Sequence, residues 1–196
     1  MISGFLLVHK DSGITSSRVV QIIKKKFNLK KVGHLGTLDP MATGLLIIAV
    51  NRATKFASLL LQSEKSYRAE VTLGTQTDTD DAEGEVISYK NIHQNKSEVK
   101  EILLTFLGDS DQLPPNYSAL KHKGQPMYKY ARDGIKVKKP ARKIFIQNIN
   151  NIEINLPKVL FDIKCSKGTY IRSIARDLGF KLGCGAHLSK LIRTSQ

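Results

Sequence analysis

The chain has 196 residues, 41% of them hydrophobic, so it can bury a core and is not a disordered tail. Its 31 Lys and Arg residues exceed the 17 Asp and Glu residues, which gives a formal net charge of +14. This surplus favours a polyanionic partner, a nucleic acid above an anionic membrane surface, although a merely basic globular protein stays open on charge alone. No apolar run approaches the roughly 18 residues of a membrane span, and the N-terminus lacks the features of a cleaved signal peptide.

The spacing of the cysteines and histidines indicates neither a disulfide framework nor a metal site. Cys165 and Cys184 are too few for a disulfide framework and lack CxxC spacing, which predicts two buried thiols in a reducing cytoplasm. The five histidines are scattered, with neither an HExxH motif nor paired-ligand spacing. We therefore expect no metal.

The first predicted elements are a strand and a basic helix. The apolar run FLLVHK at 5–10 is typical of a short strand. Ser16 or Ser17 can cap a helix, and Lys24 to Lys26, Lys30 and Lys31 make the segment 16–31 strongly basic. One apolar face of this helix would contain Val19, Val20, Ile22, Ile23 and Phe27.

The loop GHLGTLDPMATG, residues 33–44, holds a single carboxylate, Asp39, and precedes LLIIAV (45–50), a predicted buried strand. Most Asp-Pro pairs in loops are turn formers or caps. The alternative is a nucleophile or base on a loop fixed by the following strand. A glycosidase would need a second carboxylate and a metal nuclease clustered ligands, and the loop has neither. One attacking carboxylate remains possible chemistry, and residue types alone leave both interpretations open.

The middle of the chain alternates between predicted helices and strands. A helix is expected over 53–62, a half-buried strand over 66–74 and a second helix over 97–107. Between them, GTQTDTDDAEGE (74–85) has five acids without the regular spacing and closing glutamate of a calcium loop. We interpret it as a solvated loop between strands.

A second basic segment, residues 117–143, has nine Lys or Arg residues, Lys121 and Lys123 among them, and one acid, Asp133. Three tyrosines are interleaved with these charges. Cations that neutralise phosphates, mixed with aromatic rings that stack on bases, fit irregular RNA better than a regular duplex. A solvated face whose tyrosines serve the core is an equally supported alternative.

The C-terminal part predicts strands at 144–154 and 159–166, then a helix over 169–183 closed by Gly183. Strands and helices are mixed without regular βαβ alternation. This favours an α+β fold in which a mixed, mostly antiparallel central sheet is flanked by helices. Since no repeat or low-complexity linker divides the sequence, we expect one domain over 1–196.

Four segments in order resemble the TruB family of tRNA pseudouridine synthases: GHLGTLDPMATGLL, SYRAEVTLGTQTDTDDAEG, YSALKHKGQPMYKYAR and CSKGTYIRSIARDLGFKLGCGAH. The resemblance extends from residue 3 to about residue 194. It implies the pseudouridine synthase fold and isomerisation of uridine 55 in the T-loop of tRNA. In that reaction the glycosidic bond breaks, the base turns and a C–C bond forms. Because no water enters and no group finally leaves, one carboxylate suffices, and the resemblance implies no metal or organic cofactor.

The resemblance also assigns catalytic roles. Asp39 matches the family's catalytic aspartate. Tyr67 matches a tyrosine expected to stack on the target uracil and to move a proton. Arg172 matches an arginine expected to pair with the aspartate, and a bidentate contact would hold Asp39 oriented and ionised.

RNA-binding roles follow in the same way. His34 matches a histidine expected to wedge into the RNA, while Tyr170 and Leu191 match positions that line the uridine pocket. A base inside a folded loop must be flipped out before it can react. The basic segments 16–31 and 117–143, with Lys121 and Lys123, would supply phosphate contacts.

Family members continue beyond the final LIRTSQ, commonly into a small C-terminal RNA-binding domain, so a C-terminally short catalytic domain without that addition is expected. The leading hypothesis is a stand-alone tRNA-modifying isomerase, monomeric and cytoplasmic. One alternative is the catalytic subunit of a guide-RNA-dependent particle, which shares the LDP loop. The other is a non-catalytic RNA-binding or RNA-folding module.

Overall fold

The computed structural model describes residues 2–118, 120–122, 124–135, 137 and 140–196. Within them, one sheet has eight strands in the order β1-β3-β12-β4-β11-β10-β7, with β2 also paired to β3. Only β3 and β12 run parallel; the other neighbouring pairs of this described sheet are antiparallel. The expected α+β fold with a mixed, mostly antiparallel sheet is therefore confirmed.

The strands of the sheet are β1 (Gly4–Lys10), β2 (Val32–His34), β3 (Thr43–Val50), β4 (Lys65–Leu73), β7 (Gly108–Gln112), β10 (Arg142–Asn155), β11 (Lys158–Cys165) and β12 (Ala186–Ser195). Two small hairpins are formed by β5 (Thr75–Thr77) with β6 (Val86–Tyr89), and by β8 (Lys121–His122) with β9 (Gln125–Pro126). The helices are α1 (Ser16–Lys26), α2 (Ala57–Leu61), α3 (Lys96–Leu104), α4 (Met127–Arg132), α5 (Ile171–Lys181) and the 3-10 helix η1 (Asn51–Phe56).

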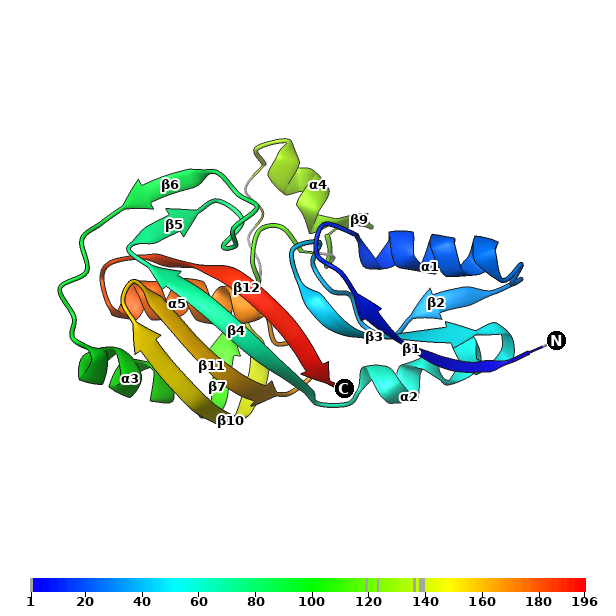
Figure 1. The fold of residues 1–196 in the computed structure, drawn as a ribbon. Coiled ribbons are helices and arrows are strands. Elements are labelled where there is room, and N and C mark those ends of the chain that lie inside the picture. The colour runs from blue at the N-terminus through cyan, green and yellow to red at the C-terminus, as the bar shows by residue number, and fades with distance from the viewer. Residues whose placement is uncertain (1, 119, 123, 136, 138–139) are drawn as a thin grey trace.

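The helices lie beside two halves of the sheet. Figure 1 shows α1 and α2 with β1–β3, and α3 and α5 with β4, β10, β11 and β12. Helix α5 packs on β12 and β4, and α3 on β10. The main core lies between these elements, and its buried members include Val71, Phe161, Ile163, Ile174 and Leu178.

Helix α1 differs from its prediction at both ends. Its N-cap is Thr15, whose side chain accepts a hydrogen bond from Arg18 N, and not Ser16 or Ser17. It ends at Lys26, well before residue 31, with three lysines in the last turn, where the helix dipole favours cations.

The apolar face of α1 is also narrower than predicted. Val19 and Ile23 are buried, whereas Ile22 and Phe27 are exposed. Residues four apart share a face of a helix, so Val19 and Ile23 point together while Ile22 is rotated away. Phe27 is the C-cap, outside the helix proper.

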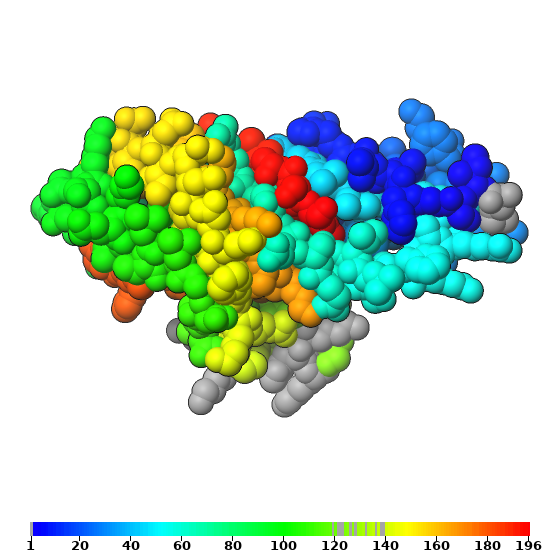
Figure 2. All heavy atoms as spheres, turned by 90° about the horizontal axis from the view of Figure 1, so that it is seen from below, coloured from blue at the N-terminus to red at the C-terminus, as the bar shows by residue number. Residues whose placement is uncertain are grey.

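Strand β12 was not predicted, yet it lies in the middle of the sheet between β3 and β4. Its alternation is broken by a register shift between Leu188 and Lys190 in its pairing with β4. One of its inward positions is Arg193, which is only 1% exposed. The bulge and the buried charge together interrupt the alternation of apolar and polar residues by which β12 could have been predicted. Figure 2 shows the end of β12, in red, at the surface between the N-terminal strands (blue) and β10 (yellow).

Other differences are small. The helix expected over 53–62 is divided into η1 and α2, and the helix expected over 97–107 is α3, capped by a capping box of Asn95 and Glu98. Strand β7 has the polar sequence GDSDQ and carries no apolar alternation. Cys165 and Cys184 are buried free thiols, as expected.

Candidate active site

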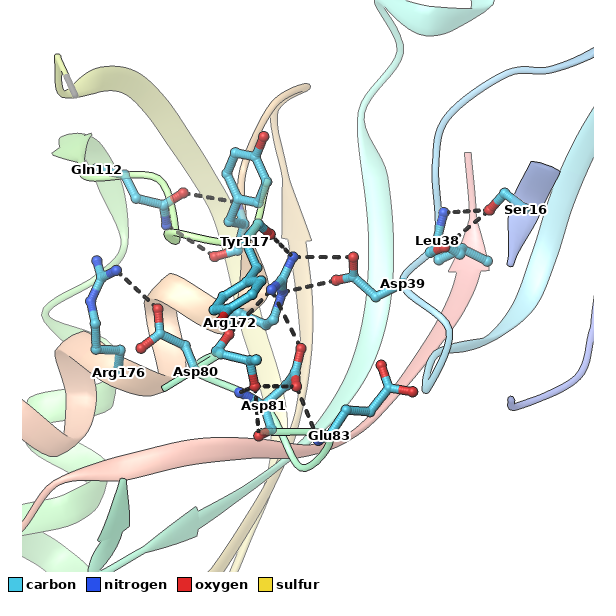
Figure 3. Close-up of polar contacts among 12 residues, drawn as sticks. Ser16, Leu38, Asp39, Asp80, Asp81, Glu83, Gln112, Tyr117, Arg172 and Arg176 are labelled. Carbon is cyan, nitrogen blue, oxygen red and sulfur yellow. Dashed lines mark hydrogen bonds and ion pairs between the residues drawn. The ribbon is translucent and has the colours of Figure 1, made fainter. Parts of the chain in front are cut away.

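The loop that carries Asp39 is fixed on both sides. The Leu38 N–H donates to Ser16 Oγ at 2.9 Å, and Ser16 Oγ–H donates back to the Leu38 carbonyl at 3.0 Å, at the start of α1 (Figure 3). On the other side the Pro40 carbonyl accepts bonds from Lys10 Nζ at 3.0 Å and Gly13 N at 2.9 Å. These contacts hold the loop backbone on either side of the carboxylate, so Asp39 is presented by a fixed loop.

Lys10 is an internal cation at the base of this loop. It is 1% exposed, and its ammonium also donates to the carbonyls of Asp11 at 2.8 Å and Ile14 at 2.7 Å. Burial lowers the pKa of Lys10, while the nearby charges of Glu83, Asp39 and Asp11 act against that shift. Three carbonyl acceptors satisfy the three ammonium protons, and this saturation makes the buried lysine a stable anchor.

The Asp39 carboxylate faces the Arg172 guanidinium from α5 (Figure 3). Arg172 Nη2 donates to Asp39 Oδ1 at 3.1 Å, and Nε lies 2.9 Å from Oδ2. The Arg172 side chain is 6% exposed, whereas 31% of the Asp39 side chain remains accessible. The expected contact between these residues is therefore present, and it leaves one side of the carboxylate open.

Arg172 is held by two other segments. Its Nη1 donates to the Thr79 carbonyl at 3.2 Å and lies 3.4 Å from Asp81 Oδ2. Its Nη2 donates to the Tyr117 carbonyl at 2.9 Å. The guanidinium is thus shared between Asp39, the loop after β5 and the segment after β7, which fixes its plane.

The acidic segment 74–85 is not the solvated loop that was expected. Asp80 and Asp81 are 7% and 3% exposed, and β5 occupies its first residues. Asp81 Oδ1 accepts bonds from Thr79 Oγ1 at 2.7 Å and Glu83 N at 3.1 Å, while Oδ2 faces Arg172. Buried carboxylates need such partners. Arg172 and Arg176 of α5 supply the positive charges that pair with Asp81 and Asp80. The sequence pattern did not reveal this pairing.

Burial raises the pKa of Asp39 above its ordinary value, and the negative charge of Asp81 acts in the same direction. The charges of Arg172 and Lys10 and the hydrogen bond from Arg172 act against this rise. The expectation that Arg172 favours the ionised form is correct in sign, but burial outweighs it. The result is a more basic carboxylate than an exposed aspartate.

Tyr67 lies on β4 directly opposite Arg193 of β12. Its side chain is buried, which raises its pKa to about 12, while the hydrogen bond and charge of Arg193 act against that rise. The charge of Asp39 also raises the pKa of Tyr67. The Tyr67 hydroxyl therefore keeps its proton at neutral pH.

Tyr170 is the N-cap residue of α5 and is half-buried. Gln112 of β7 fixes its backbone: Tyr170 N donates to Gln112 Oε1 at 2.8 Å, and Gln112 Nε2 donates to the Tyr170 carbonyl at 3.1 Å. Leu191 is buried on β12 and pairs with Ala69 of β4. Tyr170 and Leu191 thus stand on the two elements that also carry Arg172 and Arg193.

His34 ends β2, half-buried, and its Nδ1 is buried without a hydrogen-bond partner among the described residues. Burial and the charge of Arg193 lower the pKa of His34, so its ring is neutral at pH 7. In the second basic segment, Lys121 belongs to β8, whereas Lys123 lies outside the described residues.

Sequence reasoning missed several residues that build the site, namely Lys10, Asp80, Asp81, Arg176 and Arg193. One usable signal existed: Arg172 and Arg176 are spaced i, i+4, so they share a face of the helix. Asp80 and Asp81, two adjacent acids in a polar loop, are the natural partners for such a pair of arginines.

Over the described part of the chain, no group of three or more His, Cys, Asp or Glu side chains is placed to hold a metal ion. Among the described helices, none is long and apolar enough to cross a bilayer.

Comparison with known proteins places the chain in a family. Residues 24–171 match the sequence model of the TruB family pseudouridylate synthase (N terminal domain), a span that includes Asp39, Tyr67 and Tyr170. The tRNA pseudouridine synthase B of Alkaliphilus oremlandii is 46% identical over 98% of the chain and 64% of the relative. That of Shewanella woodyi is 48% identical over 98% of the chain and 61% of the relative. The chain thus spans less than two thirds of the length of these relatives.

Solved structures agree on the fold. A protein in a Cbf5-Nop10-Gar1 complex aligns with a TM-score of 0.74 and 33% identity, over 97% of this chain and 48% of its own. A protein in an H/ACA RNP bound to a substrate RNA containing 2'-deoxyuridine aligns with a TM-score of 0.73 and 30% identity, over 98% and 47%. With the match to residues 24–171, the chain belongs to the TruB family of pseudouridylate synthases.

Proposed function

We propose that this chain isomerises a uridine of tRNA to pseudouridine, with Asp39 as the catalytic carboxylate. The observation that carries the proposal is the Asp39–Arg172 pair: a single, still partly accessible carboxylate that accepts a hydrogen bond at Oδ1 from a buried arginine whose Nε lies 2.9 Å from Oδ2. Relatives at 46–48% identity are named tRNA pseudouridine synthase B, which supports tRNA as the substrate.

The chemistry fits a site with one carboxylate. The C1'–N1 bond of the uridine breaks, a C1'–C5 bond forms, the C5 proton is released and N1 gains a proton. Asp39 supplies the carboxylate that reacts with the nucleotide, and Arg172 keeps it oriented. The Tyr67 ring stacks on the uracil, and its hydroxyl, which burial keeps protonated, serves to move a proton. Atoms balance without water or a co-reactant.

The substrate is a T-loop uridine at position 55, flipped out of its loop. Tyr170 and Leu191 line the pocket for the base, and His34 wedges into the RNA where the base has left. The exposed lysines in the last turn of α1 and the basic segment 117–143, with Lys121 and Lys123, contact phosphates. Such contacts position the RNA, while the shape of its loop selects it.

Identity favours the stand-alone class over a guide-RNA-dependent subunit. The chain is 46–48% identical to proteins named tRNA pseudouridine synthase B and 30–33% identical to those in the H/ACA RNP and the Cbf5-Nop10-Gar1 complex. A pure RNA-binding module is disfavoured by Asp39, because a partly open carboxylate beside RNA repels phosphate. We place the protein in the cytoplasm as a monomer.

The test is tritium release from an unmodified T-stem-loop whose uridines carry tritium at C5. We expect release by the wild-type chain and none by Asp39→Asn, with RNA binding retained. A wild-type chain that binds the stem-loop without releasing tritium would favour the RNA-binding module. Release that survived Asp39→Asn would overturn the assignment of the carboxylate.

A further inference from the structure

Helix α5 carries two arginines that pair with two adjacent acids of one loop. Arg172 Nη1 lies 3.4 Å from Asp81 Oδ2, and one turn later Arg176 Nη1 lies 3.2 Å from Asp80 Oδ2. Figure 3 shows the two pairs side by side, with only the first reaching Asp39. The Asp80 and Arg176 side chains are 10% and 21% exposed, so water screens this second pair only partly.

The backbone of Asp80 explains how neighbouring carboxylates reach successive arginines. Consecutive side chains of an extended chain point to opposite sides. Asp80 has φ +63°, in the left-handed region that few residues other than glycine adopt, and this turn redirects the chain. Its N–H donates to the Thr77 carbonyl at 3.3 Å, and its carbonyl accepts from Leu188 N at 3.0 Å. A strained backbone conformation persists only where surrounding contacts hold it in place. At Asp80 one of these contacts is the ion pair between its side chain and Arg176.

Arg176 also holds the second segment that touches Arg172. Its Nη2 donates to the Leu113 carbonyl at 2.9 Å, and Ser173 Oγ donates to the same carbonyl at 2.9 Å. Four residues later the Tyr117 carbonyl accepts from Arg172. Both segments that fix the Arg172 guanidinium are therefore anchored one turn further along α5 by Arg176.

We propose that Arg176 is a positioning residue, which through Asp80 and Leu113 aligns Arg172 with the Asp39 carboxylate. The inference rests on the proposed function. Arg176 reaches Asp39 only through the two segments, so it acts on orientation and not on the substrate. A displacement of about 1 Å at a reacting group is enough to lower a rate substantially.

Asp177, a second carboxylate beside Arg176, provides a control for substitutions at Asp80. Arg176 Nε also lies 2.9 Å from Asp177 Oδ1, a neighbour on α5 whose side chain is 36% exposed. Asp177→Asn removes a carboxylate from the same arginine without touching the loop after β5. Asp80→Asn keeps the shape of the side chain, and asparagine tolerates positive φ, so this variant tests the carboxylate rather than the turn.

The first experiment measures the single-turnover rate at saturating T-stem-loop and, separately, the Kd for the RNA. We expect Asp80→Asn and Arg176→Gln each to lower the rate about tenfold with Kd unchanged within about twofold, and the double variant to be no slower than either single variant. Arg176→Lys should recover part of the rate, and Asp177→Asn should match the wild type. Unchanged rates, additive losses, or an equal loss in Asp177→Asn would overturn the proposal.

The second experiment does not depend on activity. A carbon-13 NMR titration of the Asp39 carboxyl reports its pKa, which Arg172, Asp81 and Lys10 all influence. Loss of a negative charge at Asp80 would by itself lower the pKa of Asp39, whereas loss of Arg172 alignment raises it. We expect a rise in Asp80→Asn and none in Asp177→Asn, and a fall or no change in Asp80→Asn contradicts the inference. If the wild type released no tritium, the proposed function would fail while this titration still decided the positioning role.

Discussion

Arg193 lies directly opposite Tyr67 across β4 and β12, and its positive charge acts against the rise in the pKa of the Tyr67 hydroxyl. The same buried guanidinium donates through Nε to the Leu45 carbonyl at 2.7 Å and through Nη2 to the Gly36 carbonyl at 3.1 Å. Gly36 and Leu45 stand before and after Asp39. One side chain of β12 therefore joins the candidate tyrosine to both ends of the loop that carries the candidate carboxylate.

Replacement of Arg193 by lysine should lower the single-turnover rate about tenfold, because lysine keeps the charge but cannot hold the Leu45 and Gly36 carbonyls with the fixed fork of a guanidinium. If part of this loss passes through the Tyr67 hydroxyl, the substitution should cost less in a Tyr67→Phe background. Arg68→Lys, on the exposed face of β4, is the control and should leave the rate unchanged. An equal cost of Arg193→Lys in both backgrounds would assign Arg193 to the loop alone.

The rate should depend on the ionisation of Asp39. The reaction needs the carboxylate, so kcat/KM is full at high pH and is lost as pH falls through the pKa of Asp39. Because burial raises that pKa, the acid limb should lie above the range of an exposed aspartate. Arg172→Gln removes a charge that lowers the pKa, so the limb should move to still higher pH.

The pH profile of tritium release checks this sign. Lys164→Gln is the control: it removes a positive charge from an exposed pair with Glu64 and should not move the limb. A limb that moved to lower pH in Arg172→Gln would show that the titrating group is not Asp39.

The sequence predicted elements whose pattern is local. Apolar patterns typical of strands located β4, β10 and β11 to within a few residues, and helical spacing with a closing glycine located α5. Strand β7 escaped because its residues GDSDQ are polar, and β12 escaped because a bulge and the inward Arg193 interrupt its alternation. Periodicity cannot detect an element whose inward positions are charged or shifted.

The candidate site likewise contains residue pairs that could be predicted from the sequence and pairs that could not. The family resemblance supplied the Asp39–Arg172 pair across 133 positions of the chain. The second pair, Asp80 with Arg176, depends on the left-handed backbone conformation of Asp80 and on the packing of its loop against α5. From its polar and acidic composition alone, this loop is predicted to be solvated. Long-range pairing of charges is a property of the folded chain, so only the structure reveals it.

The basic end of α1 should contribute to RNA binding and not to the reaction. Replacing Lys24, Lys25 and Lys26 with alanine should weaken binding of the stem-loop and reduce the slope of log K against log salt by up to about 0.7–0.9 per lost phosphate contact. The rate at saturating RNA should stay unchanged. The control is Lys96→Ala with Lys100→Ala on α3, which removes two exposed lysines beside the other half of the sheet, so the losses are compared per lysine removed. An equal loss of affinity in the control would assign binding to net charge and not to α1.

Gly44 should be indispensable to the docking of β12 on the loop. It pairs with Arg193 where β3 and β12 run parallel, and its φ is +98°. A Cβ at this position would lie 2.3 Å from the Arg193 carbonyl oxygen and 2.9 Å from its nitrogen, both of them backbone atoms that cannot rotate away. Gly44→Ala should therefore lower the free energy of unfolding by at least about 2 kcal/mol, from backbone strain and the clash together.

Gly33→Ala is the matched control for this substitution. A Cβ at Gly33 meets no heavy atom within 4 Å, and its φ is outside the left-handed region, so it should change the free energy of unfolding by less than about 1 kcal/mol. Urea unfolding with unchanged m-values measures both changes. If Gly44→Ala unfolds at the wild-type midpoint, the close approach of β3 and β12 does not limit stability. If it unfolds earlier and also loses tritium release at temperatures where it remains folded, the contact between Gly44 and Arg193 positions Asp39 as well.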